Sequence, residues 1–326
     1  MKITDWAIIF VLLAAPVLWL LQLHTGDVRE VHRLQVRYTT ALHTAVQDAA
    51  SALNLNELQY FEMGYSSVKY MRADKEQALS AFIRTMSVNL GIEDDDLSLG
   101  SMMTYIPAIV ILEYDGYSIY AVDESAENLS KTPEISHRWR PKKPYVYMDQ
   151  LGNSVSFTLD DALTAYESST GQWYRGKLDE LQRITSIPLL QDTNTFEQVR
   201  RFTIVRSIED ELAGYMNRHN EYAARLGMNY IFTLPVLGQE DWSNTLNDVG
   251  VLAFLQGIPV GDRYYNNYAF GGGRIVQSAP LIGGVDDATG LKYQYRDRCA
   301  HRYRGEQIFS RRRDAAAQGY FEAACP

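Results

Sequence analysis

An uncharged apolar run near the start of the chain constrains the fold more than any other feature. It covers residues 6–21 and directly follows Asp5. About 20 apolar residues in a helix suffice to cross a bilayer, and a tryptophan lies near each end of the run, where indole rings favour the membrane–water boundary. Pro16 lies inside the run and is expected to kink the helix. We therefore predict that residues 1–23 form a transmembrane anchor.

The pattern changes beyond this run without a break. Apolar residues now recur at spacings of three and four, as one face of an amphipathic helix requires. These positions are Val31, Leu34, Tyr38, Ala41, Leu42, Ala45, Ala49 and Leu53. We predict an amphipathic stalk helix over residues 24–56, with Gly26 as a joint. At ~1.5 Å per residue, anchor and stalk together would form a rod roughly 75 Å long.

A cleaved signal peptide and a buried helix of a soluble domain are the two alternatives to a retained anchor. Lys2 is the only basic residue before the apolar run, and the run is long for a cleavable signal. Residues 22–26 contain no small-x-small cleavage pattern. We therefore expect a retained, single-pass anchor in the cell membrane.

Two sequence rules disagree about the side of the membrane on which the large domain lies. Arg29, Arg33 and Arg37 follow the run, and the positive-inside rule would place them in the cytoplasm. However, long domains translocate largely regardless of charge, and the chain has 22 tyrosines and two cysteines that we expect to pair. We expect an extracytoplasmic domain.

Length and charge restrict the remaining possibilities. The 326 residues are 46% hydrophobic, which is enough for a sizeable core, so we assign residues 57–290 to one globular α+β domain. The net charge of −9 argues against a general nucleic-acid binder, so no nucleic-acid partner is expected.

Local signals predict the elements of this domain. A helix is expected from the N-cap Asp74 to Gly91. Two hairpins are expected, one over 108–122 with a type I′ turn at Asp115–Gly116, and one over 145–159 around Gly152. Further predicted helices are a short one capped by Asp160 or Asp161, then 173–185, 195–226 and 241–255, and a strand is predicted at 230–234. The fold class is therefore α+β, an antiparallel sheet with packed helices behind a long N-terminal helix.

Several conspicuous stretches have a plain structural interpretation. The acidic run 93–96 is expected to be a solvated linker rather than a cation site. The basic aromatic stretch 137–143 could contact phosphates or lipid headgroups, but we expect a solvated loop. His219 lies beside an apolar stripe without ligands at metal-binding spacing, so we expect a packed or capping histidine. The glycines at 271–273 lack the frame of a phosphate loop and indicate a turn or strand bend.

The last segment, 291–326, contains both cysteines of the chain, Cys299 and Cys325. A unit this small cannot form a sufficient core alone, so we expect a disulfide, worth roughly 3 kcal/mol in the loop-entropy model. Free thiols are one alternative. A metal site is the other, because the segment resembles small zinc modules that end in Gly-Tyr-x-Pro-Cys. With His301 it still has fewer than four ligands.

No catalytic motif is present. The sequence has neither Gly-x-Ser-x-Gly nor His-Glu-x-x-His, and its six histidines are scattered. We therefore predict no catalytic, cofactor-binding or metal-binding residues and no enzyme activity. A hydrolase that uses two distant carboxylates is the alternative.

The N-terminal layout resembles the type IV pilin-like family, including minor pilins of tight-adherence systems. The shared features are a short tail, an acid at position 5, an apolar helix that continues into an amphipathic one, and then an antiparallel sheet. The resemblance implies that Asp5 is an assembly residue that pairs with a neighbouring subunit, and that Pro16 loosens the helix. This chain has Asp where the family has Glu. Residues 75–270 also look like uncharacterised membrane-anchored proteins of Gram-positive bacteria, and this resemblance gives no information about an activity.

The resulting expectation is a membrane-anchored structural protein, a pilin-like or pilus-associated subunit. Its partners would be the lipid bilayer and other pilin-like or membrane subunits, bound through the N-terminal helix. The first alternative is a sensory or ligand-binding ectodomain, and the second is a membrane-tethered enzyme.

Overall fold

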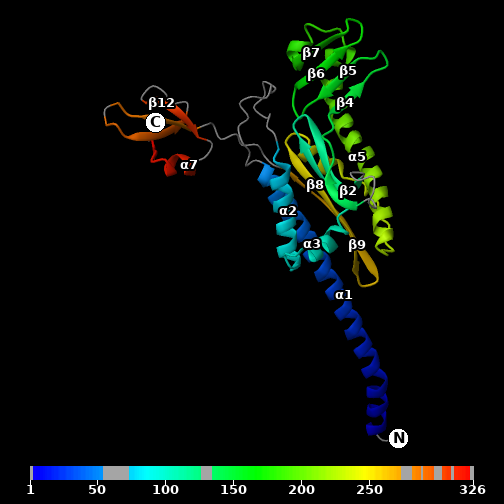
Figure 1. Ribbon diagram of the computed structural model, residues 1–326. Helices are drawn as coiled ribbons and strands as arrows, with labels where there is room; N and C mark the ends of the chain where they lie inside the picture. Colours follow the sequence, from blue (N-terminus) through cyan, green and yellow to red (C-terminus); the bar gives the residue numbers. More distant parts are fainter. Residues whose placement is uncertain are drawn as a thin grey trace.

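The computed structural model describes residues 3–53, 73–125, 134–272, 281–287, 289–296, 303–309 and 312–323. It shows an α+β protein with antiparallel sheets and packed helices (Figure 1). The elements are α1 (Ile3–Leu53), α2 (Lys75–Leu90), α3 (Asp96–Met103), β1 (Ala108–Glu113), β2 (Gly116–Ser125), β3 (Glu134–Trp139), β4 (Tyr145–Met148), β5 (Ser154–Phe157), β6 (Ala162–Glu167), β7 (Gln172–Lys177), α4 (Leu178–Leu181), η1 (Pro188–Gln191), α5 (Thr193–Arg225), α6 (Gln239–Thr245), β8 (Gly250–Val260), β9 (Arg263–Gly272), β10 (Leu281–Val285), β11 (Lys292–Arg296), β12 (Arg304–Phe309), α7 (Arg312–Ala317) and β13 (Phe321–Glu322).

The first element is one long helix, α1, which continues through Pro16 and Gly26 without a break. Its C-terminal half packs against α2, β8 and β9. The predicted apolar stripe is confirmed: Val31, Leu34 and Tyr38 are half-buried, and Ala41, Leu42, Ala45, Ala49 and Leu53 are buried in the main core. The amphipathic half of α1 is therefore part of the core of the head, by which we mean the described residues 31–53 and 73–272.

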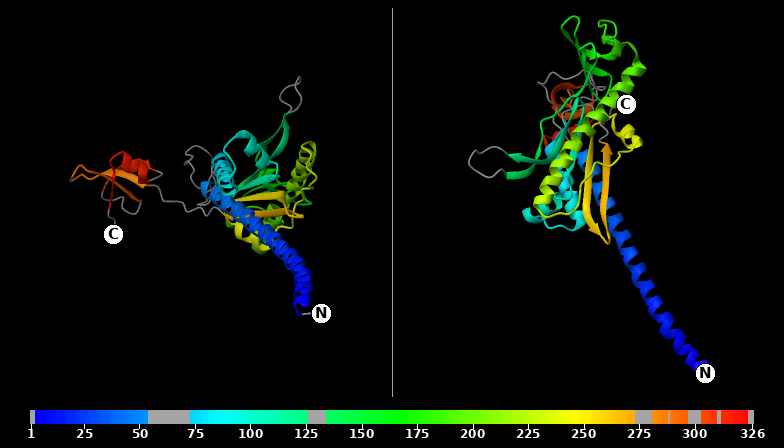
Figure 2. Two further views of the ribbon diagram at one scale, coloured as in Figure 1. Left: turned by 90° about the horizontal axis from the view of Figure 1, so that it is seen from below. Right: turned by 90° about the vertical axis from the view of Figure 1, so that its right-hand side faces the viewer.

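The central sheet of the head has five antiparallel strands in the order β3-β2-β1-β8-β9. Every residue of β1 is buried, and so are the first eight residues of β8, so both faces of the sheet are covered. Helices α1 and α2 lie on one side of the sheet and α5 on the other (Figure 2). This three-layer arrangement explains why the central strands lack an alternating polar pattern.

A second antiparallel sheet, β4-β5-β6-β7, lies at the end of the head that is farthest from the N-terminus (Figure 1). The N-terminal part of α5 supports its inner face. There, Phe196 meets Phe157 edge to face with ring centroids 5.4 Å apart. Arg200 is buried and donates a hydrogen bond to the Thr158 carbonyl over 3.0 Å.

Two helices predicted in this region were wrong. Residues 162–167 and 172–177 form the hairpin β6–β7 instead of a short helix and the start of the 173–185 helix. Asp160 does not cap a helix; its carboxylate accepts hydrogen bonds from the Ala162 amide and the Tyr114 hydroxyl in a turn. Buried and half-buried residues alternate along β6, which is the period of a strand and not of a helix.

The first predicted hairpin is confirmed, but its predicted turn is wrong. Glu113 pairs with Gly116, so Tyr114 and Asp115 form the turn, and none of these residues has the positive φ of a type I′ turn. Gly116 has a different role: a Cβ there would lie 2.4 Å from the Lys143 carbonyl oxygen. The glycine is required because another backbone segment approaches closely.

Several end signals are confirmed. The Asp74 side chain accepts from the Gln77 amide at the start of α2, and Gly91 ends α2 with φ of 68°. The second hairpin joins β4 to β5 around Gly152. The longest helix of the head, α5, is followed by Gly227 at φ of 80°, although its N-cap is Asp192 and not Thr195.

Three other expectations in the head were wrong. Residues 137–139 of the basic aromatic stretch, predicted as a solvated loop, belong to strand β3, which pairs with β2. Residues 230–234 form no strand, because side chains of Asn220 and Gln256 replace the ladder partners of the Phe232 and Thr233 backbone. The helix predicted over 241–255 is α6 followed by β8, which begins at Gly250.

The acidic run and the basic stretch are both tied into the structure. Asp95 is not simply solvated: it caps α3 and accepts from the amides of Leu97 and Ser98. In the basic stretch, Lys142 lies 3.0 Å from the Glu113 carboxylate, and Arg140 and Lys143 pair with Asp123 and Glu211.

The remaining described residues form a small four-stranded sheet, β12-β10-β11-β13, with α7. Phe309, Ala315 and Tyr320 make its own small core. The sheet begins at Leu281, before the predicted boundary at 291. Cys299, His301 and Cys325 lie outside the described residues, and the predicted disulfide remains a prediction.

Among the residues that the structure describes, no helix combines the length and the apolar character needed to cross a membrane.

Candidate functional site

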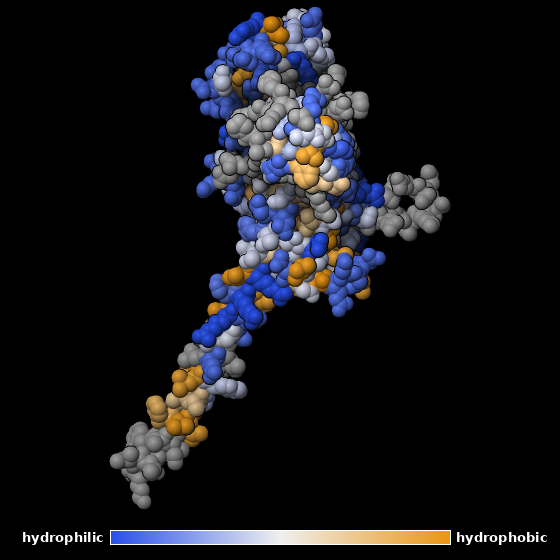
Figure 3. All heavy atoms as spheres, turned by 90° about the vertical axis from the view of Figure 1, so that its left-hand side faces the viewer, coloured by the Kyte–Doolittle hydropathy of each residue, from blue (hydrophilic) through white to orange (hydrophobic). Residues whose placement is uncertain are grey.

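The N-terminal half of α1 extends beyond the head and exposes large apolar side chains. Between 56% and 70% of each side chain's surface is open at Phe10, Val11, Leu12, Leu13, Val17, Leu18 and Trp19. Figure 3 shows an orange section in the protruding half of α1, and on this face hydrophilic side chains separate it from the head. Soluble proteins rarely leave so many apolar side chains open together unless the surface meets a partner or a membrane. This segment, residues 10–19, is the exposed apolar segment of α1.

Contact between α1 and the head begins at the tip of the β8–β9 hairpin. Gly261 forms this tip with φ of 63°, and a Cβ at this residue would lie 2.8 Å from a methyl group of Val31. Between the tip and α1 lies an open groove, which we call the neck groove. It is lined by Asp27, Val28, Glu30, Val31, His32, Leu34, Gln35, Gly261, Asp262 and Arg263.

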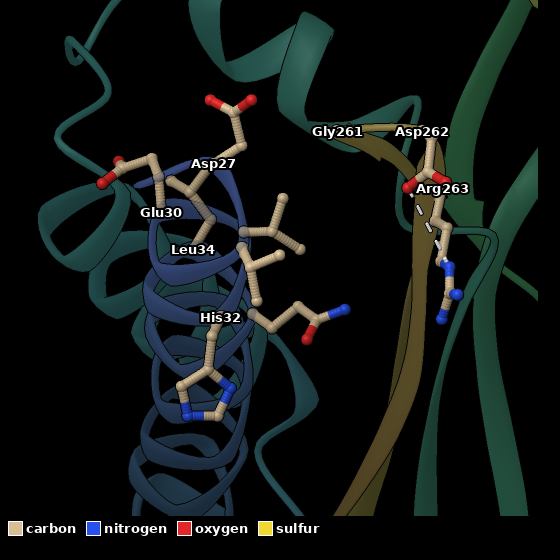
Figure 4. Close-up of a pocket in the computed structure, with 10 residues that line it drawn as sticks. Asp27, Glu30, His32, Leu34, Gly261, Asp262 and Arg263 are labelled. Carbon is tan, nitrogen blue, oxygen red and sulfur yellow. Dashed lines mark ion pairs between the residues drawn. The ribbon is translucent and has the colours of Figure 1, made fainter. Parts of the chain in front are cut away.

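The charged groups of the neck groove do not converge on one point. Figure 4 shows the carboxylates of Asp27 and Glu30 directed away from each other and from the hairpin. The guanidinium of Arg263 lies 3.9 Å from the Asp262 carboxylate, and both side chains are largely exposed. A catalytic site requires its acid, base or nucleophile within hydrogen-bond reach of a shared reacting atom. The groove therefore has the character of a solvated joint between helix and head.

A pair of histidines, with His219 buried and His137 half-buried, is a second candidate site in the head. His137 on β3 and His219 on α5 have ring centroids 5.9 Å apart, and His219 also packs edge to face on Phe232. His219 donates from Nε2 to the Thr104 carbonyl over 2.9 Å. Burial lowers the pKa of each histidine from 6.5 to about 4. Both rings are therefore neutral at pH 7, and the expectation of a packed histidine at position 219 is confirmed.

Metal binding has no candidate centre in the described part of the chain. No group of three or more His, Cys, Asp or Glu side chains there lies close enough to hold an ion. Two imidazoles alone, as at His137 and His219, do not complete a tetrahedral site.

The two predicted assembly residues both lie on α1. Asp5 is in the first turn of the helix, and the position of its side chain is outside what the structure describes. Pro16 is exposed within the exposed apolar segment. Along the helix axis the two residues are roughly 16 Å apart at ~1.5 Å per residue. They therefore belong to the same half of α1.

Sequence reasoning missed the neck groove. Its second wall is the tip of a hairpin in a stretch that the sequence assigned partly to a helix. The only available signal was Gly261 followed by Asp262 between two runs rich in β-branched and aromatic residues. This pattern is typical of a hairpin.

Comparison with known proteins identifies no relative: no protein-family model, no curated protein and no solved structure matches this chain.

Proposed function

We propose that this chain is a structural assembly subunit of the pilin-like kind, held by the N-terminal half of α1 and displaying its head outside the cytoplasm. In this proposal residues 6–21 are buried in the bilayer before assembly and among the same helices of neighbouring subunits afterwards. The observation that carries the proposal is the contrast along α1: residues 41–53 are built into the core of the head, whereas the apolar side chains of residues 10–19 are open.

The position of the apolar segment supports a role in attachment. It lies at the far end of a helix whose other half is fixed to the head by contacts with α2, β8 and β9. A partner that binds the N-terminal half is therefore connected to the head through one continuous helix. The membrane anchor itself rests on the sequence, namely on the uncharged run that follows Asp5.

We propose that Asp5 is the assembly residue that pairs with a neighbouring subunit. A carboxylate in an apolar environment is costly unless it is paired. In an assembly of parallel helices, the N-terminal amino group of a neighbouring subunit can supply that pairing charge. Capping of α1 at the membrane face is the competing role for the same residue.

A paired set of substitutions tests the attachment role. Leu13→Glu with Leu18→Glu places two charges in the exposed apolar segment, and Val28→Glu places one outside it, at another exposed position of α1. We expect the double variant to move from the membrane fraction to the soluble fraction, whereas Val28→Glu stays with the membrane. Equal distribution of the two proteins would overturn the proposal.

Asp5→Ala tests the assembly role. We expect this variant to be lost from filaments or higher-order complexes, measured by cross-linking in membranes, while it remains in the membrane fraction with a folded head. Asp27→Ala is the matched control, because Asp27 is an exposed acid of the same helix beyond the apolar segment. Unchanged cross-linking of Asp5→Ala would leave only the capping role for Asp5 and would refute pilin-like assembly.

A further inference from the structure

The outer face of the β4–β7 sheet is an exposed surface that the proposed assembly role does not use. Strand register places its side chains in two rows across all four strands. The first row is Met148, Ser154, Tyr166 and Trp173, and the second row is Val146, Ser156, Thr164 and Arg175. We call these eight side chains the sheet platform.

The platform combines apolar side chains with hydroxyl groups. Trp173 is 65% exposed and Met148 is 68% exposed, at opposite ends of the first row. The rings of Tyr166 and Trp173 pack together with centroids 5.1 Å apart. Three hydroxyl side chains, Ser154, Ser156 and Thr164, are half-buried between the apolar ones. Each hydroxyl can both donate and accept a hydrogen bond.

The position and charge of the platform exclude two kinds of occupant. It lies at the end of the head opposite the N-terminus of α1, so it faces away from any membrane that holds that helix (Figure 1). Of its eight side chains only Arg175 is charged at pH 7, and a single charge gives little complementarity to a polyanion or a polycation.

The size of the platform argues against a stable protein partner. Four strands at ~4.8 Å spacing span roughly 20 Å including side chains, and two rows about 7 Å apart span roughly 14 Å including side chains. The product is about 280 Å², whereas a stable protein interface buries about 800 Å² on each partner. A small, flat ligand fits this area better.

We infer that the sheet platform binds a neutral polysaccharide, with sugar rings stacked along the row from Met148 to Trp173. One face of a pyranose ring presents C–H groups, which are slightly positive and contact the electron-rich faces of Trp173 and Tyr166. The hydroxyls at the ring edges exchange hydrogen bonds with the serine and threonine side chains of the platform. The exclusion of a membrane as occupant rests on the proposed anchoring of α1, and the inference adds a binding activity to the displayed head.

An exposed cross-strand aromatic pair also stabilises a sheet, by roughly 0.2–1 kcal/mol. That structural role alone predicts no ligand. Binding and stability must therefore be measured on the same variants.

Sedimentation with insoluble cellulose and chitin tests the inference, using the full chain in detergent. We expect wild type to sediment with at least one of the two polymers, and Trp173→Ala to bind about tenfold more weakly, since loss of one stacked ring removes about 1.4 kcal/mol. Phe202→Ala is the matched control, because Phe202 is an equally exposed aromatic residue, 66% open, on the outer side of α5. It should bind like wild type.

Three outcomes would overturn the inference. The first is that wild type sediments with neither polymer. The second is that Trp173→Ala and Phe202→Ala bind equally well. The third is self-association in size-exclusion chromatography that Trp173→Ala abolishes, which would assign the platform to a second copy of the chain. Unfolding midpoints of both variants, measured by circular dichroism, separate lost binding from lost structure.

Discussion

The two halves of α1 share one backbone geometry but have opposite surroundings. In the C-terminal half, Leu42, Ala45 and Val46 have no exposed surface, and the sheet and α2 enclose them. In the N-terminal half, Leu12, Leu13 and Leu18 are each more than 60% exposed. Helix formation therefore does not decide burial. The one-faced pattern of the second half matches a sheet on one side and water on the other, whereas the apolar pattern of the first half matches an environment that is apolar all round.

A leucine in each half tests this difference most strongly. Leu42→Ala should lower the free energy of unfolding of the head by about 3 kcal/mol, because it removes core contacts and leaves a cavity. Leu13→Ala should leave that free energy within about 0.5 kcal/mol of wild type, because its side chain contacts no core. Urea denaturation followed by circular dichroism measures both. Equal losses of unfolding free energy in the two variants would mean that both halves of α1 contribute equally to the stability of the head.

The pH dependence of stability sharpens the same contrast, since His137 and His219 both belong to the head. The pKa of His137 and of His219 is about 4 in the folded protein and 6.5 ordinarily, so the unfolded chain binds more protons between these values. Stability is fully present above pH 6.5 and is lost as pH falls towards 4, by on the order of 2–3 kcal/mol for one histidine.

A histidine variant isolates this contribution from that of the carboxylates, which also titrate in acid. His219→Phe keeps an aromatic ring against Phe232 but removes the proton-binding group. Urea midpoints at pH 7.5 and pH 4.5 should differ less in this variant than in wild type. An unchanged pH difference would exclude His219 as a source of acid instability.

Two neighbouring glycines provide the smallest and most local test. A Cβ at Gly271 would lie 2.7 Å from the carbonyl oxygen of Val46 on α1, whereas a Cβ at Gly272 would have no atom within 4 Å. Gly271→Ala should therefore cost about 2 kcal/mol by pushing α1 away from β9, and Gly272→Ala should cost less than about 0.5 kcal/mol. Thermal unfolding of the two variants compares them directly. If Gly271→Ala were neutral, the contact between α1 and β9 would be looser than the structure shows.

Local signals in the sequence located α2, α5 and two hairpins, but they also predicted helices where β6, β7 and β8 lie. The Asp74 cap, the Gly91 stop and the Gly227 stop act within a few residues of the chain, so they can be recognised without knowing the fold. Strands β3, β6 and β7 were missed although each pairs with a strand that neighbours it in the chain, because strand stability depends on side-chain packing across the sheet, which a short sequence window does not show.

The same distinction explains the glycines. Gly116 and Gly271 have no conformational need for glycine in their own backbone angles, and their reason is a backbone segment from elsewhere in the chain. The turn signal Asp115–Gly116 was therefore interpreted through the wrong property of glycine. The candidate surfaces differ in the same respect. The exposed apolar segment of α1 could be recognised in the sequence because it is one continuous run, whereas the sheet platform and the neck groove combine residues from separate segments and could not.

The sequence by itself determined that the chain begins with an apolar helix, that this helix becomes one-faced, and that an α+β head follows. These features depend on composition and on periods of a few residues, which are written in the chain directly. Only the tertiary structure decided that the one-faced half lies inside the head, that two histidines meet between β3 and α5, and that eight side chains from four strands share one open face. Those groups are distant in sequence, and strand register and layer packing bring them together.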